Sequence, residues 1–171
     1  MKTSELPPTT FAAYYTPYIQ AVGEQDLLEA LEVSLHEFIH FVREIPLGKH
    51  EYRYAEGKWT IKDIIQHLID SERIFSYRAL RIARNDKTPL PGFEQNDYAD
   101  VARANDRSLQ SLLEELSITR HSTLQLFKTF NDEELKRTGT AAEYPIMVGA
   151  VGFVIVGHMM HHQKVYQERY L

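Results

Sequence analysis

Histidines are the residues of this chain whose type and spacing could do metal chemistry, and there are eight of them. Two pairs stand four residues apart, His36 with His40 and His158 with His162. On an α-helix, residues at this spacing lie one turn above one another, so two imidazoles can reach a single metal ion. The residues around each pair indicate which pair faces a pocket.

The first pair lies in the string HEFIH, which matches the HExxH pattern of zinc metalloproteases, with Glu37 in the place of the general base. On a helical wheel, His36 and His40 share a side with the charged residues Glu29, Glu32 and Arg43. The apolar residues fall on another side, and Pro46 stands where the extended metzincin pattern needs a third histidine. A catalytic site needs a cavity, so the sequence favours a solvent-exposed helix face over a protease.

The second pair lies in the string GHMMHHQK, near the end of the chain. His158 and His162 share the most apolar sector of their segment, with Val151, Val154, Ile155 and Val165. A buried neutral imidazole keeps one donor and one acceptor that must be satisfied, and a metal ion satisfies one nitrogen of each ring. His161 lies about 60° off this sector and is expected to be an exposed neighbour. His50 and His121 have no partner at helical spacing and are expected at the surface.

A third ligand is expected from another helix, and His67 is the best candidate. It lies in the middle of WTIKDIIQHLIDSE, on a helix side that mixes Ile64 with Ser71 and Arg78. Such a mixture is typical of the wall of a polar cavity. Structural zinc sites have four protein ligands, whereas reactive sites keep three and leave one position open. The sequence therefore predicts an open metal site made by His67 together with the second pair.

The surrounding pattern predicts helices and few strands. Apolar residues recur at helical spacing in four segments, at about 24–44, 60–84, 99 or 105–130, and from 145 almost to the end. Thr60 with Asp63, and Asn131 with Glu134, form capping-box patterns that begin the second helix and a short helical turn. Segments 85–97 and 136–144 are predicted to be loops. We expect an all-α four-helix bundle, up-and-down or with a crossover connection, in a single domain, 1–171, with residues 1–23 packing on it as an N-terminal extension.

Composition narrows the classes of partner. The net charge of −5 offers no basic face for nucleic acid. There is no cysteine, which excludes disulfides, thiolate ligands and a cysteine nucleophile. The most apolar stretch, 146–160, is too short to cross a bilayer, and the N-terminal residues MKTSELPPTTF lack a secretory signal. We therefore expect a cytoplasmic protein with no membrane or nucleic-acid partner.

The segment GKWTIKDIIQHLIDSE, followed far downstream by HMMHH, resembles the DinB-like superfamily of four-helix proteins, above all its bacillithiol S-transferase-like branch. The resemblance implies one zinc or nickel ion held by His67, His158 and His162. It matches Arg78 to an arginine of the family's second helix, and it implies a homodimer. It also implies that a low-molecular-weight thiol, such as bacillithiol, mycothiol or glutathione, serves as nucleophile or cofactor. The loop TPLPGFEQNDYA follows the family only loosely, and it is expected to shape the pocket for a small-molecule substrate.

Three hypotheses follow for function. In the first, the ion activates a low-molecular-weight thiol for transfer, and Arg78, with Arg81 as a further candidate, holds carboxylates of that thiol. In the second, a metal-bound water hydrolyses an ester or amide, with Asp70 as general base and Glu72 as the weaker candidate because it lies off the His67 side. Asp70 could instead orient a ligand histidine. In the third, the chain is a non-enzymatic metal-binding module of a stress response.

Overall fold

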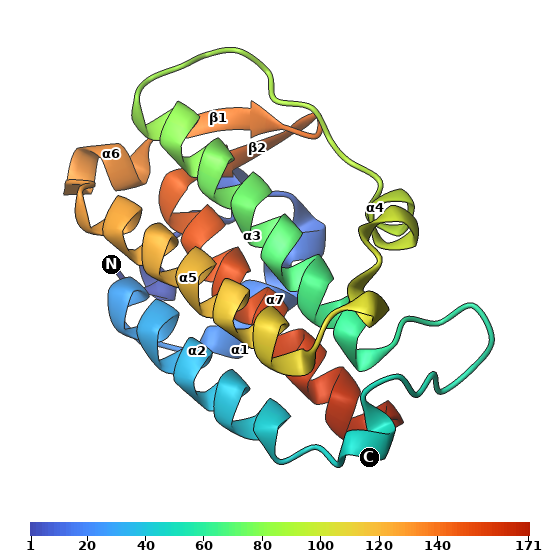
Figure 1. Cartoon of the computed structure of the whole chain (residues 1–171). Coiled ribbons are helices and arrows are strands. Elements are labelled where there is room, and N and C mark those ends of the chain that lie inside the picture. Colours follow the sequence, from blue (N-terminus) through green and yellow to red (C-terminus); the bar gives the residue numbers. More distant parts are fainter.

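The computed structural model describes residues 1–171, and most of the chain is helical. Four long helices form a bundle (Figure 1): α2 (Leu27–Arg43), α3 (Ile61–Ala83), α5 (Leu109–Lys128) and α7 (Val148–Arg169). Shorter elements surround it: α1 (Thr16–Val22), α4 (Gln95–Ala102), α6 (Asp132–Lys136), β1 (Thr138–Ala141) and β2 (Tyr144–Met147). The predicted four-helix bundle is confirmed. No helix, α7 included, combines the length and apolar composition that a membrane crossing requires.

The helix boundaries follow from local capping chemistry. Thr60 and Asp63 bond each other's backbone N–H groups at the start of α3, as the capping box predicts. The predicted loop 85–97 is wrong at its end, because α4 begins at Gln95. The predicted start of the third long helix at residue 99 or 105 is also wrong. Arg103 has a left-handed φ of 51° that ends α4, and Ser108 caps a new helix that begins at Leu109.

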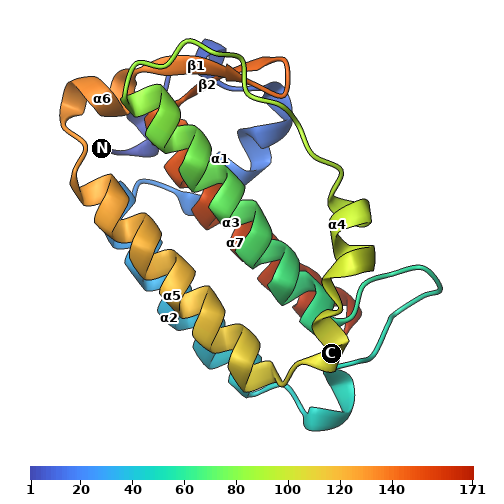
Figure 2. The same ribbon diagram turned by 45° about the horizontal axis from the view of Figure 1, so that its top comes forward.

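The bundle contains a crossover rather than simple neighbours. Around its axis α2 lies between α5 and α7, and α3 lies between the same two helices, so each consecutive pair α2–α3 and α5–α7 is diagonal. The helices α3 and α5 run parallel, since their contacts follow the same order along both: Arg73 with Glu115, then Ser76 with Thr123. The connection 84–108, which carries α4, therefore returns along the whole bundle (Figures 1 and 2).

A β-hairpin stands where the sequence predicted a loop at 136–144. β1 pairs antiparallel with β2, and Ala142 and Glu143 between them both have positive φ, of 49° and 70°. Such two-residue turns usually carry Asn or Gly, which explains why the sequence showed no hairpin signal. Leu90 bonds to the hairpin through Thr140 O and the Ala142 N–H, each at 2.9 Å. The hairpin thereby fixes the start of the crossover loop beside the bundle.

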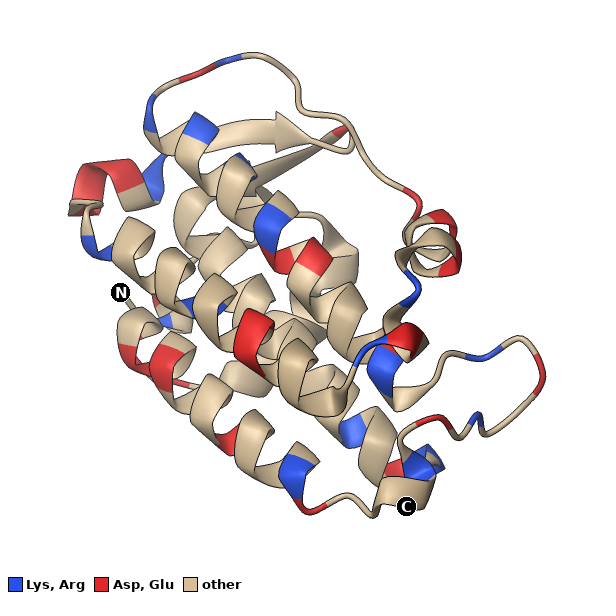
Figure 3. Cartoon of the chain, in the orientation of Figure 1, with Lys and Arg blue, Asp and Glu red and all other residues tan.

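A polar layer divides the core into two apolar clusters, one around Phe153 and the other around Phe38. In this layer the Arg120 side chain is fully buried and donates to both carboxylate oxygens of Glu72, at 2.8 and 3.0 Å. It also donates to Leu31 O at 2.8 Å and to Ser34 Oγ at 2.9 Å. The Arg120–Glu72 pair joins α5 to α3, and the bonds to Leu31 and Ser34 join α5 to α2. Neither buried charge is therefore left without a partner. On the outside of the bundle, basic and acidic positions are interspersed (Figure 3).

The N-terminal segment packs closely against the bundle at a glycine of α7. The helix α1 packs against α7, and a Cβ added to Gly157 would overlap the backbone of Tyr18. Only glycine allows this approach, because the atoms in the way belong to backbone and cannot rotate aside.

We expect Gly157→Ala to lower the free energy of unfolding by about 1–3 kcal/mol, the usual cost of overpacking. This is opposite in sign to the gain of about 1 kcal/mol that alanine brings to an unhindered helix. Urea unfolding measures the change. Gly48→Ala is the matched control, since nothing lies within 4 Å of a Cβ there, and it should change stability by less than about 0.5 kcal/mol. Equal stability of the two variants would show that α1 does not need this close approach.

Candidate metal centre

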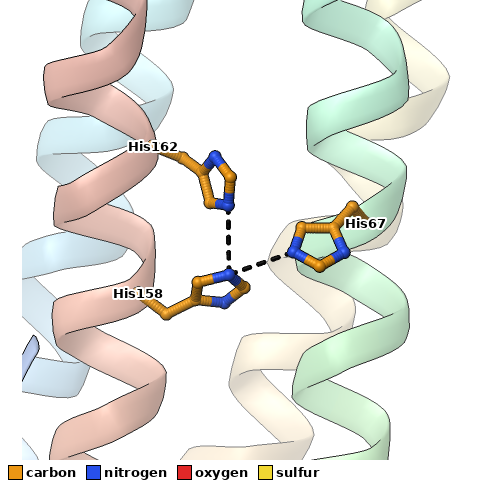
Figure 4. A group of neighbouring side chains, drawn as sticks. All are labelled: His67, His158 and His162. Atoms are coloured by element: carbon orange, nitrogen blue, oxygen red, sulfur yellow. Dashed lines mark hydrogen bonds between the residues drawn. The ribbon is translucent and has the colours of Figure 1, made fainter. Parts of the chain in front are cut away.

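The three histidines that the sequence singled out converge between α3 and α7. His67 lies two turns into α3, and His158 and His162 lie one turn apart on the antiparallel α7 (Figure 4). The Nε2 atom of His158 is 3.0 Å from Nε2 of His67 and 3.0 Å from Nε2 of His162. All three ligand nitrogens lie within 4.8 Å of one another. The histidines therefore present three nitrogens to one point.

Hydrogen bonding alone does not account for this arrangement. A neutral imidazole Nε2 carries either one proton or one in-plane lone pair, never both. His158 Nε2 therefore has one bonding direction, yet two nitrogens lie 3.0 Å from it. A cation among the three rings would accept one lone pair from each. The residues present thus fit a divalent metal ion, with no thiolate or carboxylate in the group and one coordination position left open.

The protonation of the rings suits the same role. Burial lowers the pKa of His67 to about 4. Burial, with smaller effects from the neighbouring histidines, also holds the pKa values of His158 and His162 well below the usual range. All three rings are therefore neutral near pH 7, and their lone pairs are available to a metal. His161 is exposed, as expected, and packs its ring 5.4 Å from that of Tyr18.

Other side chains hold the rings in place. With Nε2 of His67 facing the centre, its Nδ1–H can donate to Ser71 Oγ, 3.3 Å away. The Trp59 ring lies 4.8 Å from the His67 ring, and the Tyr18 ring lies 5.6 Å from that of His158. Such contacts fix the orientation of ligand rings. Nδ1 of His162 is buried and has no partner in the chain.

A cavity of about 340 Å³ opens beside His67 and His158. The crossover loop forms one wall through Gly92, Phe93 and Glu94, as the sequence led us to expect of TPLPGFEQNDYA. Another part of the wall comes from the N-terminal segment and is made by Tyr14, Tyr15 and Tyr18. A second cavity of about 270 Å³ adjoins the centre at His162 and Trp59.

The two candidate arginines lie in different surroundings. Arg78 lines the larger cavity and is only 3% exposed, and it donates to Pro91 O at 2.8 Å. Its guanidinium carbon is 5.7 Å from the centre of the Phe75 ring, and no ion pair of the chain includes it. Arg81 is instead paired with Asp86, away from the histidines. Of the two, only Arg78 is placed to meet a ligand.

The candidate general bases lie away from the cavity. Asp70 faces α5, where its Oδ1 accepts from Gln66 Nε2 at 3.0 Å, and burial raises its pKa. Both carboxylate oxygens of Glu72 are held by Arg120. Neither carboxylate bonds a ligand histidine.

The histidines outside the centre are mostly exposed. His36 and His40 are exposed on α2 and belong to no group of metal-binding side chains. His121 is exposed as well, whereas His50 is partly buried, with Nε2 3.0 Å from Ile45 O.

Two features of the site could not be predicted from the sequence. The tyrosines of the N-terminal segment carry no helical periodicity, and the density of aromatic residues in FAAYYTPY was the only available signal. The pairing of Glu72 with Arg120 spans 48 positions of the chain and leaves no local pattern.

Comparison with known proteins places this architecture in a family. Residues 30–165 match the model of the DinB superfamily. The chain is 30% identical over 73 residues to OB0413 of Oceanobacillus iheyensis, which is described as an inferred metal-dependent hydrolase. These residues span 42% of this chain and only 40% of that relative.

Two solved structures share the fold. YfiT of Bacillus subtilis, described as an inferred metal-dependent hydrolase with an unusual four-helix bundle topology, superposes with a TM-score of 0.74 at 19% identity, covering 83% of this chain and 82% of YfiT. A mycothiol-dependent maleylpyruvate isomerase superposes with a TM-score of 0.69 at 9% identity, covering 96% of this chain and 62% of the isomerase. With its family model matched over most of its length and its bundle shared with these proteins, the chain belongs to the DinB superfamily.

Proposed function

We propose that this chain is a divalent-metal-dependent enzyme that activates a low-molecular-weight thiol and transfers it to a small electrophile. The observation that carries the proposal is the convergence of three neutral imidazole nitrogens beside an open cavity. When bound there, a zinc or nickel ion would supply a full positive charge that lowers the pKa of a thiol. The chain has no cysteine, so the thiol must arrive with a ligand.

The chain's own residues would bind and orient the reactants. Neutral His67, His158 and His162 leave the charge of an ion uncompensated, which favours an anionic sulfur over a neutral one. Arg78 would hold a carboxylate of the thiol or of the electrophile, since it has no carboxylate partner within the chain. The aromatic walls would keep water away from the reacting atoms.

The related proteins support the proposal at two levels. OB0413 and YfiT are both described as inferred metal-dependent hydrolases. The isomerase that shares the fold depends on a thiol, mycothiol. We include in the proposal the homodimer that the family resemblance implies and the cytoplasmic location that the composition led us to expect. Sedimentation of the purified protein tests the dimer.

A hydrolase is the second candidate, and the names of OB0413 and YfiT favour it. Water would then be the nucleophile, and a general base would be needed near the cavity. Asp70 is the candidate, since its raised pKa suits proton transfer. It would have to exchange its bond with Gln66 for one to the substrate or to a ligand histidine, so the geometry favours the thiol reaction.

The thiol reaction predicts a specific pattern of turnover. The metal-loaded protein should conjugate monochlorobimane only when a thiol such as bacillithiol or glutathione is added, and a chelator should abolish the rate above background, as fluorescence of the conjugate reports. Reaction of the thiol alone is the control. Hydrolysis of activated esters without a thiol would instead support the hydrolase. No metal-dependent turnover in either the conjugation assay or the ester assay would instead support a non-enzymatic metal-binding module.

A further inference from the structure

The cavity beside His67 and His158 contains a buried arginine that has no acidic partner. Arg78 is buried in its wall, yet no carboxylate of the chain lies within ion-pair distance of it. Glu94 also lines the cavity, but its Oε1 accepts from the backbone and side chain of Asn96, at 3.1 and 3.2 Å, as the cap of α4. Since an unpaired buried charge is costly, Arg78 would stabilise an anion that enters this cavity.

A hydroxyl accompanies the arginine. Tyr15 is buried and lines the same cavity as Arg78. Both side chains pack on Phe75, with the Tyr15 ring centroid 6.2 Å and the Arg78 guanidinium carbon 5.7 Å from the centre of its ring. The guanidinium by itself would lower the pKa of the Tyr15 hydroxyl. Burial and the neighbouring Tyr14 outweigh that effect and raise the pKa of Tyr15, so the phenol stays protonated and can donate a hydrogen bond. An anion beside Arg78 would thus meet two donors, the charged guanidinium of Arg78 and the neutral hydroxyl of Tyr15.

The rest of the wall is aromatic. The Tyr15 ring packs edge-on against Phe75, with centroids 6.2 Å apart, and the Tyr14 ring lies 4.2 Å from that of Tyr15. Tyr18 completes this wall and reaches the ring of His158. Rings in such arrangements pack best against another flat π-system, so a planar body between Arg78 and the histidines is favoured over a bulky aliphatic one.

This wall lies outside the part of the chain that matches the family. The family model begins at residue 30, whereas Tyr14, Tyr15 and Tyr18 precede it. The three tyrosines of the wall are therefore not part of the stretch that the family model describes.

We propose that Tyr15 and Arg78 form an anion-binding subsite, and that the tyrosine wall selects a substrate with a flat, conjugated or aromatic body carrying a carboxylate. The inference deepens the proposed function and rests on it for the reaction, but the binding of such a ligand can be measured without turnover.

Calorimetric titration with three probes tests the subsite: benzoate, the uncharged benzamide, and the non-planar cyclohexanecarboxylate. We expect benzoate to bind about tenfold more tightly than benzamide, because a charge-assisted pair is lost with the amide. We expect it to bind about threefold more tightly than cyclohexanecarboxylate, because the aromatic contacts are lost. Equal affinity for benzoate and benzamide, or no binding of benzoate, would overturn the proposal. Equal affinity for the two carboxylates would overturn the part assigned to the tyrosine wall.

Variants assign the binding to residues. Arg78→Met should weaken benzoate binding about tenfold or more, and Tyr15→Phe, which keeps the ring, about fivefold. Arg43→Met and Tyr77→Phe are matched controls at exposed positions, and both should leave the affinity unchanged. Should Arg78→Met fail to fold, Arg78→Lys keeps the charge but loses the planar fork, and it should weaken binding by a smaller factor. Unchanged affinity in the Arg78 variant that folds would overturn the proposal, and unchanged affinity in Tyr15→Phe would overturn the role of Tyr15.

Titrations of metal-loaded and chelator-treated protein separate this inference from the proposed function. Benzoate binding that depends on Arg78 in both forms supports the subsite, whatever the thiol assays show. Binding that disappears with the metal and ignores Arg78 means that the ion holds the carboxylate, and the subsite is then wrong.

Discussion

The His158→Ala variant is expected to purify without a bound divalent metal, and the unaltered chain is expected to purify with about one ion per molecule. The reason is geometric. Nε2 of His158 is the atom that lies 3.0 Å from both other ligand nitrogens, so its loss leaves only two ligand nitrogens, one on α3 and one on α7. Metal analysis of the purified proteins by mass spectrometry measures the ion directly.

Stability gives a second reading of the same variant. An ion that binds only the folded chain raises the melting temperature, so a chelator should lower the melting temperature of the unaltered protein and leave that of His158→Ala unchanged. The double variant His36→Ala/His40→Ala is the matched control, because this pair has the same spacing but is exposed on α2, and it should keep its metal. Full metal content in His158→Ala, or its loss in the control, would refute the assignment of the centre.

Arg120→Met is expected to lower the free energy of unfolding by about 3–5 kcal/mol, the usual cost of leaving one member of a buried ion pair alone. The Glu72 carboxylate would lose the donors that hold both its oxygens, and it is only 3% exposed. Leu31 O and Ser34 Oγ would lose a donor as well. Urea unfolding followed by circular dichroism measures the change.

Two further variants show whether the charge is the cause. The double variant Glu72→Leu/Arg120→Met removes both charges and should regain most of the lost stability. Arg73→Ala breaks an ion pair with Glu115 in which the arginine is 52% exposed, and it should cost at most about 1 kcal/mol. A loss in Arg120→Met no larger than in Arg73→Ala would show that the polar layer does not hold the bundle together. Because Glu72 and Arg120 lie around the same narrow gap in the packing as His158, we also expect the loss of Arg120 to weaken metal binding.

The sequence predicted the helical parts of the fold where local chemistry decides them. The capping box at Thr60 sets the start of α3 whatever the helix packs against. The apolar stripe of α2 faces the core, so His36 and His40, which match the protease pattern, face outward. The hairpin and α4 escaped prediction because their boundaries depend on residues with unusual φ values, Ala142, Glu143 and Arg103, none of which is a glycine or asparagine that would mark such a turn.

By itself, the sequence determined which residues can form the centre, since helical spacing places His158 and His162 on one face of α7 and polar neighbours set His67 apart on α3. Only the tertiary structure decided that α3 runs beside α7, because the order of helices in the bundle depends on a crossover that spans its whole length. Only the structure could show that Tyr15 and Arg78 line one cavity and that Arg120 pairs with Glu72. Each of these contacts joins segments far apart in the chain, and their energy comes from burial and charge pairing in the folded state, which leave no periodic trace in the sequence.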